Sequence, residues 1–177
     1  MIVRDVAVAD SKGKWRSKIS LVDRDGKTLK DGTDFDSKKA VFTYDEGGND
    51  IIPSDASIPA GTIVYVRADA KGKSYTGSVT GSYLILQKGH DISKLKVKVR
   101  SKSYTGKAVK LTEDDISFKS GKKTVEGVQF VIDASTYRNN VNKGTASVEI
   151  RGTGDWGGTV GVTYKIGSRG LLFAIFD

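Results

Sequence analysis

The chain has 177 residues, of which 37% are hydrophobic and 28% are charged, and this balance excludes a protein built from membrane-spanning helices. It contains 0 Cys and 1 His, which excludes disulfide scaffolds, zinc ribbons, iron–sulfur sites and Cys–His catalysis. Its 29 Lys and Arg outnumber its 21 Asp and Glu, and the resulting charge of +8 favours anionic partners.

No stretch of the sequence has sustained helical periodicity, whereas a two-residue alternation of apolar and polar residues recurs. In the stretch 94–100 the apolar residues Leu95, Val97 and Val99 alternate with basic residues. A strand would bury that apolar set and expose the basic one. In chain order, strands are predicted at 63–68, 94–100, 146–151 and 160–166. Glycine-rich turns separate these runs, so the sequence predicts an all-β protein.

An internal repeat gives the domain organisation. The pattern of Gly, Lys, acidic residue and Phe in 25–35 recurs in 120–130, and the pattern of 75–85 recurs in 156–166. The sequence therefore predicts two copies of one β-module, at 1–88 and 92–167, followed by an apolar tail at 168–177. We expect the tail to be an edge strand of the second module, with an interaction segment as the alternative.

The repeat also predicts two small cores, with roughly one large apolar residue from each strand. In the first module we expect a core of Leu21, Phe35, Val64, Val66, Tyr83 and Ile85. In the second module we expect a core of Val97, Val99, Phe118, Phe130, Val148, Ile150, Tyr164 and Ile166.

Several motifs carry a family resemblance. The second module contains YRNNVNKGTA at 137–146 and GTGDWGGT at 152–159, followed by an aromatic-x-Ile strand, and the first contains IPAGTIVYV at 58–66. The pattern resembles the bacterial immunoglobulin-like repeats of Gram-positive, often gut-dwelling, cell-surface proteins. The resemblance covers roughly residues 15–167, although Trp156 and Asp155 replace the usual Tyr and Asn. It implies two tandem immunoglobulin-like β-sandwich modules without shared catalytic residues.

Catalytic signals are weak. The acidic clusters, including 113–115, fall in predicted turns, where carboxylates accept backbone hydrogen bonds. His90 lies between the modules without a Ser or Cys motif beside it. The letters GxGxxG at 152–157 are not followed by a helix, so a β-turn is expected there. We therefore expect no enzyme activity, no cofactor and no metal site.

Carbohydrate binding is the most specific alternative function. β-Sandwich modules can bind sugars through exposed aromatic rings flanked by amide and carboxylate groups. The candidate residues are Trp156, Asp155, Trp15 and Tyr75. The opposing interpretation is structural, because Trp156 matches Tyr75 in the repeat and both could be aromatic residues that stabilise the turn.

The remaining expectations concern partners and compartment. Basic residues are interleaved with acidic ones along the chain, which argues against a nucleic-acid partner. The absence of Cys favours the outside of a cell, and the charged first residues lack a signal peptide, so we expect a piece of a longer protein. The function expected is a non-catalytic extracellular spacer or adhesive module on a bacterial cell surface. Its partners would be other domains of that protein and a glycan, cell-wall polymer or host glycoprotein, and the third alternative is an adhesin that binds host immunoglobulin or mucin.

Overall fold

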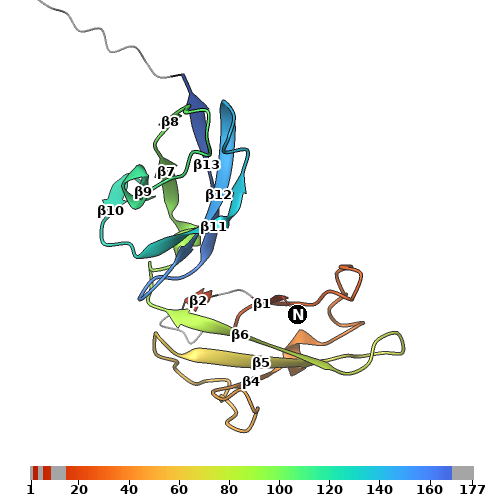
Figure 1. Cartoon of the computed structure of the whole chain (residues 1–177). Helices are drawn as coiled ribbons and strands as arrows, with labels where there is room; N and C mark the ends of the chain where they lie inside the picture. The colour runs from red at the N-terminus through yellow and green to blue at the C-terminus, as the bar shows by residue number, and fades with distance from the viewer. Residues whose placement is uncertain (1, 4–5, 9–14, 169–177) are drawn as a thin grey trace, which may run out of the picture. The chain divides into compact units, whose positions relative to one another are not determined.

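The computed structural model describes residues 2–3, 6–8 and 15–168, and these residues form strands, turns and three short 3-10 helices (Figure 1). The described residues contain no α-helix, and none of their helices is long and apolar enough to cross a membrane. The chain divides into two compact units, Met1–Asp91 and Ile92–Asp177, here called unit 1 and unit 2. The all-β class predicted from the sequence is confirmed.

Unit 1 is built on a four-stranded sheet of order β2-β6-β5-β4. The long strands β5 and β6 form its antiparallel centre, from the pair Ile63–Leu84 to the pair Asp69–Ser78, and β2 runs parallel to β6. A short antiparallel pair, β1 with β3, lies outside this sheet. The elements are β1 (Ile2–Val3), β2 (Val6–Val8), β3 (Ile19–Ser20), η1 (Ser37–Lys39), β4 (Val41–Thr43), β5 (Ile63–Asp69) and β6 (Ser78–Leu86).

Unit 2 has two sheets, a four-stranded one of order β11-β12-β13-β8 and a three-stranded one of order β10-β9-β7. Residues of both sheets contribute to one hydrophobic core. The elements are η2 (Ile92–Lys94), β7 (Lys96–Val99), β8 (Lys102–Ser103), η3 (Glu113–Asp115), β9 (Ile116–Ser120), β10 (Lys123–Val125), β11 (Phe130–Arg138), β12 (Gly144–Gly152) and β13 (Thr159–Gly167).

The two units repeat one strand arrangement. In each, the last two long strands pair antiparallel, and a short early strand runs parallel to the last one, β2 to β6 in unit 1 and β8 to β13 in unit 2. In each, an early strand also pairs antiparallel with the strand that leads into a hairpin, β1 with β3 and β7 with β9. The hairpin turns contain Gly26 and Gly121, whose positive φ values of 83° and 61° favour glycine. The sequence repeat is therefore also a repeat of structure.

Alternation along the strands fills both cores as predicted. In β5, Val64, Val66 and Ala68 are buried, and the residues between them face outward. All six core residues predicted for the first module are buried in unit 1. In the second module, five of the predicted residues are buried, and Val97, Val99 and Phe130 pack against them while partly exposed. The strand predictions at 63–68, 146–151 and 160–166 are confirmed by β5, β12 and β13. The strand predicted at 94–100 is shorter, because η2 ends at Lys94 and β7 covers Lys96–Val99.

A buried tyrosine fixes each unit at matching positions of its last strand. The Tyr83 hydroxyl donates to the Trp15 carbonyl (3.1 Å) and accepts from the Ser17 N–H (3.3 Å). The Tyr164 hydroxyl donates to the Val109 carbonyl (2.7 Å). Both acceptors belong to the irregular segment that leads into the hairpin sheet, so each tyrosine ties that segment to the last strand. Burial raises the pKa of both tyrosines to about 12.

The predicted tail, residues 168–177, lies outside the described residues except for Ser168, which follows β13 and is exposed.

Replacing either buried tyrosine with phenylalanine should destabilise its unit by about 1–3 kcal/mol, because a carbonyl loses a hydrogen bond, although the Val109 carbonyl keeps a second donor, the Asn140 Nδ2 (3.2 Å). Tyr83→Phe should cost more than Tyr164→Phe, since the Ser17 N–H also loses its acceptor. Because the folded pKa of about 12 exceeds the usual value of 10.0, this stabilisation is complete below pH 10 and is lost as the pH rises through 12. Urea unfolding at pH 7 and between pH 10 and pH 12 measures both effects.

Tyr44→Phe is the control, because the Tyr44 side chain is exposed. Its free energy of unfolding should change by less than about 0.5 kcal/mol. If the two buried-site variants behaved like this control, the tyrosine hydroxyls would have no anchoring role.

Candidate functional site

The clearest candidate site is a pocket at one end of unit 1, where the loop between β5 and β6 faces the hairpin turn after β3. Its volume is about 400 Å³. Tyr75 and Thr76 come from the loop, and Asp23 and Arg24 come from the hairpin turn. The complete lining is Leu21, Val22, Asp23, Arg24, Asp25, Leu29, Ala68, Ala70, Tyr75, Thr76, Gly77, Ser78 and Val79.

Asp23 positions the polar side of this pocket. Its Oδ1 accepts hydrogen bonds from the backbone N–H groups of Asp25 (3.0 Å) and Lys27 (2.9 Å), which closes the turn. Its Oδ2 accepts from the Tyr75 hydroxyl at 3.4 Å. The carboxylate is therefore engaged by the turn and by Tyr75, and it holds the half-buried tyrosine ring at the mouth of the pocket.

The lining combines two chemical characters. Leu21, Leu29 and Ala68 supply apolar surface from the edge of the core, while Asp23 and Arg24 supply charged groups. Small-molecule sites of proteins commonly combine an apolar lining with a few polar groups that orient the ligand. The arrangement suits a small polar molecule that also has an apolar face, which describes a saccharide ring.

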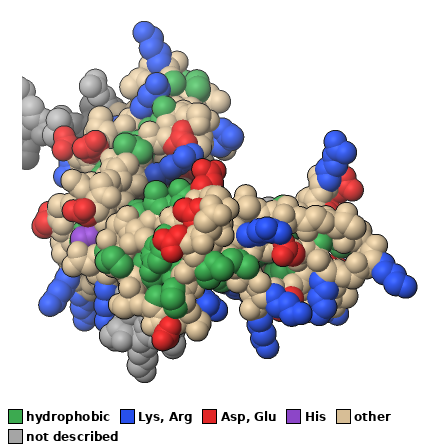
Figure 2. Space-filling model, turned by 90° about the horizontal axis from the view of Figure 1, so that it is seen from below, with side chains coloured by type: hydrophobic (Ala, Val, Ile, Leu, Met, Phe, Trp, Pro, Cys, Tyr) green, Lys and Arg blue, Asp and Glu red, His purple; other side chains and the backbone are tan. Residues whose placement is uncertain are grey.

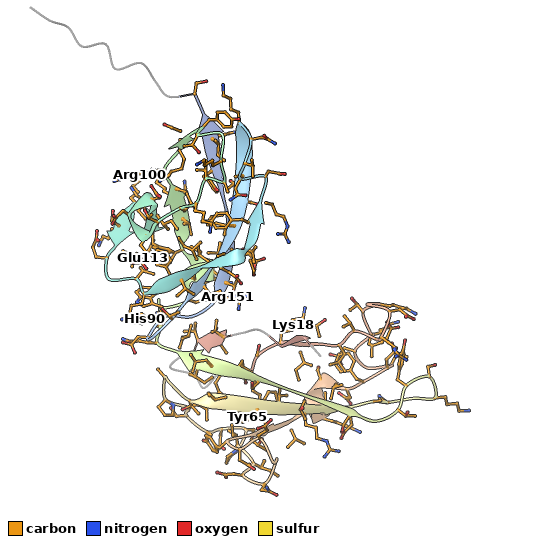
Figure 3. The ribbon with its side chains drawn as sticks, in the orientation of Figure 1. Lys18, Tyr65, His90, Arg100, Glu113 and Arg151 are labelled. Atoms are coloured by element: carbon orange, nitrogen blue, oxygen red, sulfur yellow. The ribbon has the colours of Figure 1, made fainter. Side chains whose placement is uncertain are left out.

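A second hollow, of about 490 Å³, lies on the outer face of the sheet formed by β4, β5 and β6. Its floor includes Tyr65 (labelled in Figure 3), Thr80 and Ser82, and the loop 46–48 forms part of its wall. Asp45 shapes that loop by accepting the Asp50 N–H (2.6 Å) and the Asn49 N–H (3.2 Å). These hydrogen bonds lower the pKa of Asp45 below its usual value.

Both tryptophans, which the alternative function of carbohydrate binding requires to be exposed, are buried. Trp15 is 0% exposed, lies edge-on to Phe42 at 5.5 Å between ring centroids, and donates from its indole Nε1 to the Ala56 carbonyl (2.8 Å). Trp156 is 8% exposed and belongs to the core of unit 2. Neither indole presents a free face for stacking on a sugar, because each ring fills apolar space in its own core.

The other two candidates remain accessible but lie in different units. Tyr75 is half-buried at the pocket of unit 1. Asp155 is exposed in the glycine-rich turn of unit 2, where its N–H donates to the Gln129 side chain (3.3 Å). The Trp156 N–H donates to the Thr153 carbonyl (3.0 Å), which confirms the predicted β-turn. The four predicted residues thus do not form one site.

Of the acidic residues at 113–115, Asp115 has a structural role. The Asp115 Oδ2 accepts from the Thr112 N–H (2.8 Å) and from the Lys102 Nζ (2.7 Å). Burial acts to raise the pKa of Asp115, but the hydrogen bonds from Lys102 and Thr112 outweigh it and the pKa is lowered.

Within the described part of the chain, no group of three or more His, Asp and Glu residues could hold a metal ion. His90 lies between β6 and η2 (Figure 3), and its N–H donates to the Gln87 carbonyl (3.0 Å).

Sequence reasoning missed the partnership between Tyr75 and Asp23. The two residues are 52 positions apart, and only the strand register brings the two loops together. The available signal was the DRDGK turn at 23–27, whose Asp and Gly predict a tight turn.

The burial of both indoles can be checked by fluorescence. The emission maximum should be blue-shifted, and acrylamide should quench it weakly, because both rings are excluded from water. Tyr104→Trp is the control, since it places an indole at an exposed position of unit 2 and should add a strongly quenched component. Strong quenching of the unmodified chain would contradict the burial of Trp15 and Trp156.

Comparison with known proteins gives no match: no family model, no curated protein and no solved structure matches the chain.

Proposed function

We propose that the chain is a pair of non-catalytic modules of a bacterial cell-surface protein, which space or attach its other domains. The observation that carries this proposal is the repeat of one strand arrangement in two units, each with its own core. Such a unit can be added in tandem because it depends little on its neighbours for stability. A spacer needs stable repeated units, and it does not need catalytic groups.

The finer part of the proposal is that each unit is an immunoglobulin-like sandwich. In support, unit 2 buries side chains of two mainly antiparallel sheets in one core, which is the layout of such sandwiches. The residues that carry the family resemblance also coincide with strands, because the GTA motif at 144–146 opens β12 and the aromatic-x-Ile motif at 164–166 lies in β13. An extracellular location follows from the same resemblance.

The independence of the two units is testable in the full chain. Ile150→Ala removes a fully buried side chain from the core of unit 2 and should destabilise that unit by about 2–5 kcal/mol. Hydrogen exchange read by mass spectrometry should then accelerate in unit 2 and stay unchanged in unit 1. Val64→Ala is the matched variant, and it should give the reverse pattern.

Loss of protection throughout the chain in either variant would contradict the proposal of independent modules. Turnover of a glycan or peptide substrate by the purified chain would contradict the proposal of a non-catalytic role.

The pocket of unit 1 supports a second candidate function, binding of a small saccharide. The support is the half-buried Tyr75 ring, held by Asp23 above an apolar floor. In this site the aromatic ring that contacts the sugar is Tyr75, since Trp15 and Trp156 are buried. The charged Arg24 and Asp25, both exposed at the rim, supply donors and acceptors for sugar hydroxyls.

A panel of mono- and oligosaccharides titrated into the isotopically labelled chain tests this second function. Binding should shift NMR signals of the pocket residues, and Tyr75→Ala should weaken the affinity at least about tenfold, since one aromatic contact accounts for roughly 1.4 kcal/mol. Tyr104→Ala, at an exposed tyrosine of unit 2, is the control and should bind normally. A spectrum unchanged by every sugar would reject the pocket as a saccharide site.

A further inference from the structure

The net charge of the chain is concentrated in unit 2. Unit 1 contains 14 Lys and Arg and 13 Asp and Glu, so its formal charge is +1. Unit 2 contains 15 Lys and Arg and 8 Asp and Glu, so its formal charge is +7. Acidic residues are interleaved with basic ones in both units, but in unit 2 they are too few to balance them. Figure 2 shows extended Lys and Arg side chains projecting from several parts of the surface.

Part of this charge gathers on the outer face of the three-stranded sheet β10-β9-β7. Val97 and Phe118 are register partners, and both face the core. Because side chains alternate across a strand, Lys96 and Lys98 of β7 and Lys119 of β9 occupy the opposite face. We call these three residues the lysine face. Two further exposed lysines are Lys94, in η2 just before β7, and Lys122, in the turn between β9 and β10.

The register places two of these lysines directly opposite each other. Lys96 is the Cα partner of Lys119, whose partner on the other side is Thr124. Like charges at directly opposite positions destabilise a sheet. The pair therefore brings two positive charges together on this face at an electrostatic cost, and a polyanion bound there would offset that cost.

Carboxylates are placed away from the Lys96–Lys119 pair. Glu113 and Asp114 precede β9 and therefore lie at the end of the sheet where Arg100 follows β7 (Figure 3). Asp115 is buried and bonded to Lys102. Glu126 follows Val125, the partner of Phe118, so it is the exposed carboxylate beside Ser117 at the edge of this face. The ion pairs described in unit 2 join Lys102 to Asp115 and Arg151 to Asp133, so neither involves the lysine face.

We propose that the lysine face binds a flexible linear polymer of phosphodiester groups. Lysine ammonium groups attract phosphates as point charges. Lys96 and Lys98 are two residues apart on one strand, about 6.6 Å at the usual rise of strands, so consecutive lysines can meet successive phosphates of an extended chain. This proposal is independent of the proposed spacer role, because the face would bind such a polymer in any setting.

The remaining residues of this face favour a polymer without bases over other polyanions. The outward positions beside the lysines are Ser117 and Thr124, both small and polar. Single-stranded nucleic acids are held by aromatic side chains that stack on bases, and membrane surfaces are held by apolar side chains beside the basic ones. Neither type of side chain occupies an outward position among the described residues of these three strands.

The test measures binding of fluorescently labelled poly(glycerol phosphate) to the full chain by anisotropy, at several salt concentrations. The affinity should fall steeply with salt as counterions are released. The variant K96E/K98E/K119E should bind at least about tenfold more weakly, since it reverses three contact charges. The control K38E/K39E/K73E changes the net charge equally at three exposed lysines of unit 1 and should retain the affinity within about twofold.

Equal weakening by both variants would overturn the proposal, because net charge alone would then explain binding. Tighter binding of oligo(dT), or of vesicles of an anionic phospholipid, than of poly(glycerol phosphate) would overturn the choice of polymer. Circular dichroism checks that each variant is folded. Should the triple variant not fold, K96Q/K119Q provides the second test, with weaker binding and an equal or higher melting temperature expected because the like-charge pair is gone.

Discussion

The structure of each unit depends on tyrosine hydroxyls that bond to the backbone. Tyr83 and Tyr164 extend from the last strand of their units to a carbonyl in the irregular segment that precedes the hairpin sheet. That segment makes few ladder hydrogen bonds of its own, so its backbone polar groups depend on other partners. The Val109 carbonyl, for example, accepts from the Asn140 Nδ2 (3.2 Å) as well as from Tyr164. In unit 2 the work is divided, because Tyr137 accepts the Leu111 N–H (2.8 Å) while Tyr164 binds the Val109 carbonyl. Two tyrosines therefore hold the segment in unit 2, whereas in unit 1 Tyr83 binds both the Trp15 carbonyl and the Ser17 N–H.

The sequence predicted those parts of the fold that depend on local periodicity. Alternation located β5, β7, β12 and β13, and matching turn glycines revealed the repeat before the strand pairing was known. The irregular segments were not predictable in this way. Trp156 lies in such a segment, and an aromatic ring among glycines resembles a binding surface. The burial of Trp15 was within reach of the sequence, because the exposed Arg16 and Lys18 alternate with buried residues there. Strand register was equally out of reach, and it alone brings Tyr75 to Asp23 and Lys96 to Lys119.

Repetition also shows where the two units have diverged. Tyr75 and Trp156 occupy the same position of the repeat, in the loop before the last strand. The smaller tyrosine borders a pocket, whereas the larger indole is part of the core. Charge follows a similar division, because unit 1 is nearly neutral and unit 2 is strongly basic. One architecture therefore supports two different surfaces, a concave one in unit 1 and a flat cationic one in unit 2.

The parallel pairing of an early strand with the last strand has a mechanical consequence. In unit 1, Val6 to Val8 pair with Leu84 to Leu86 in the same direction, so the chain enters the ladder at one end and leaves it at the other. A force that pulls the two ends apart slides these strands along each other and loads their hydrogen bonds together, in shear. An antiparallel pairing of the same two strands would instead open like a zipper, one bond at a time. The strands β8 and β13 repeat this parallel geometry over a shorter ladder, so tension would load their hydrogen bonds in shear as well.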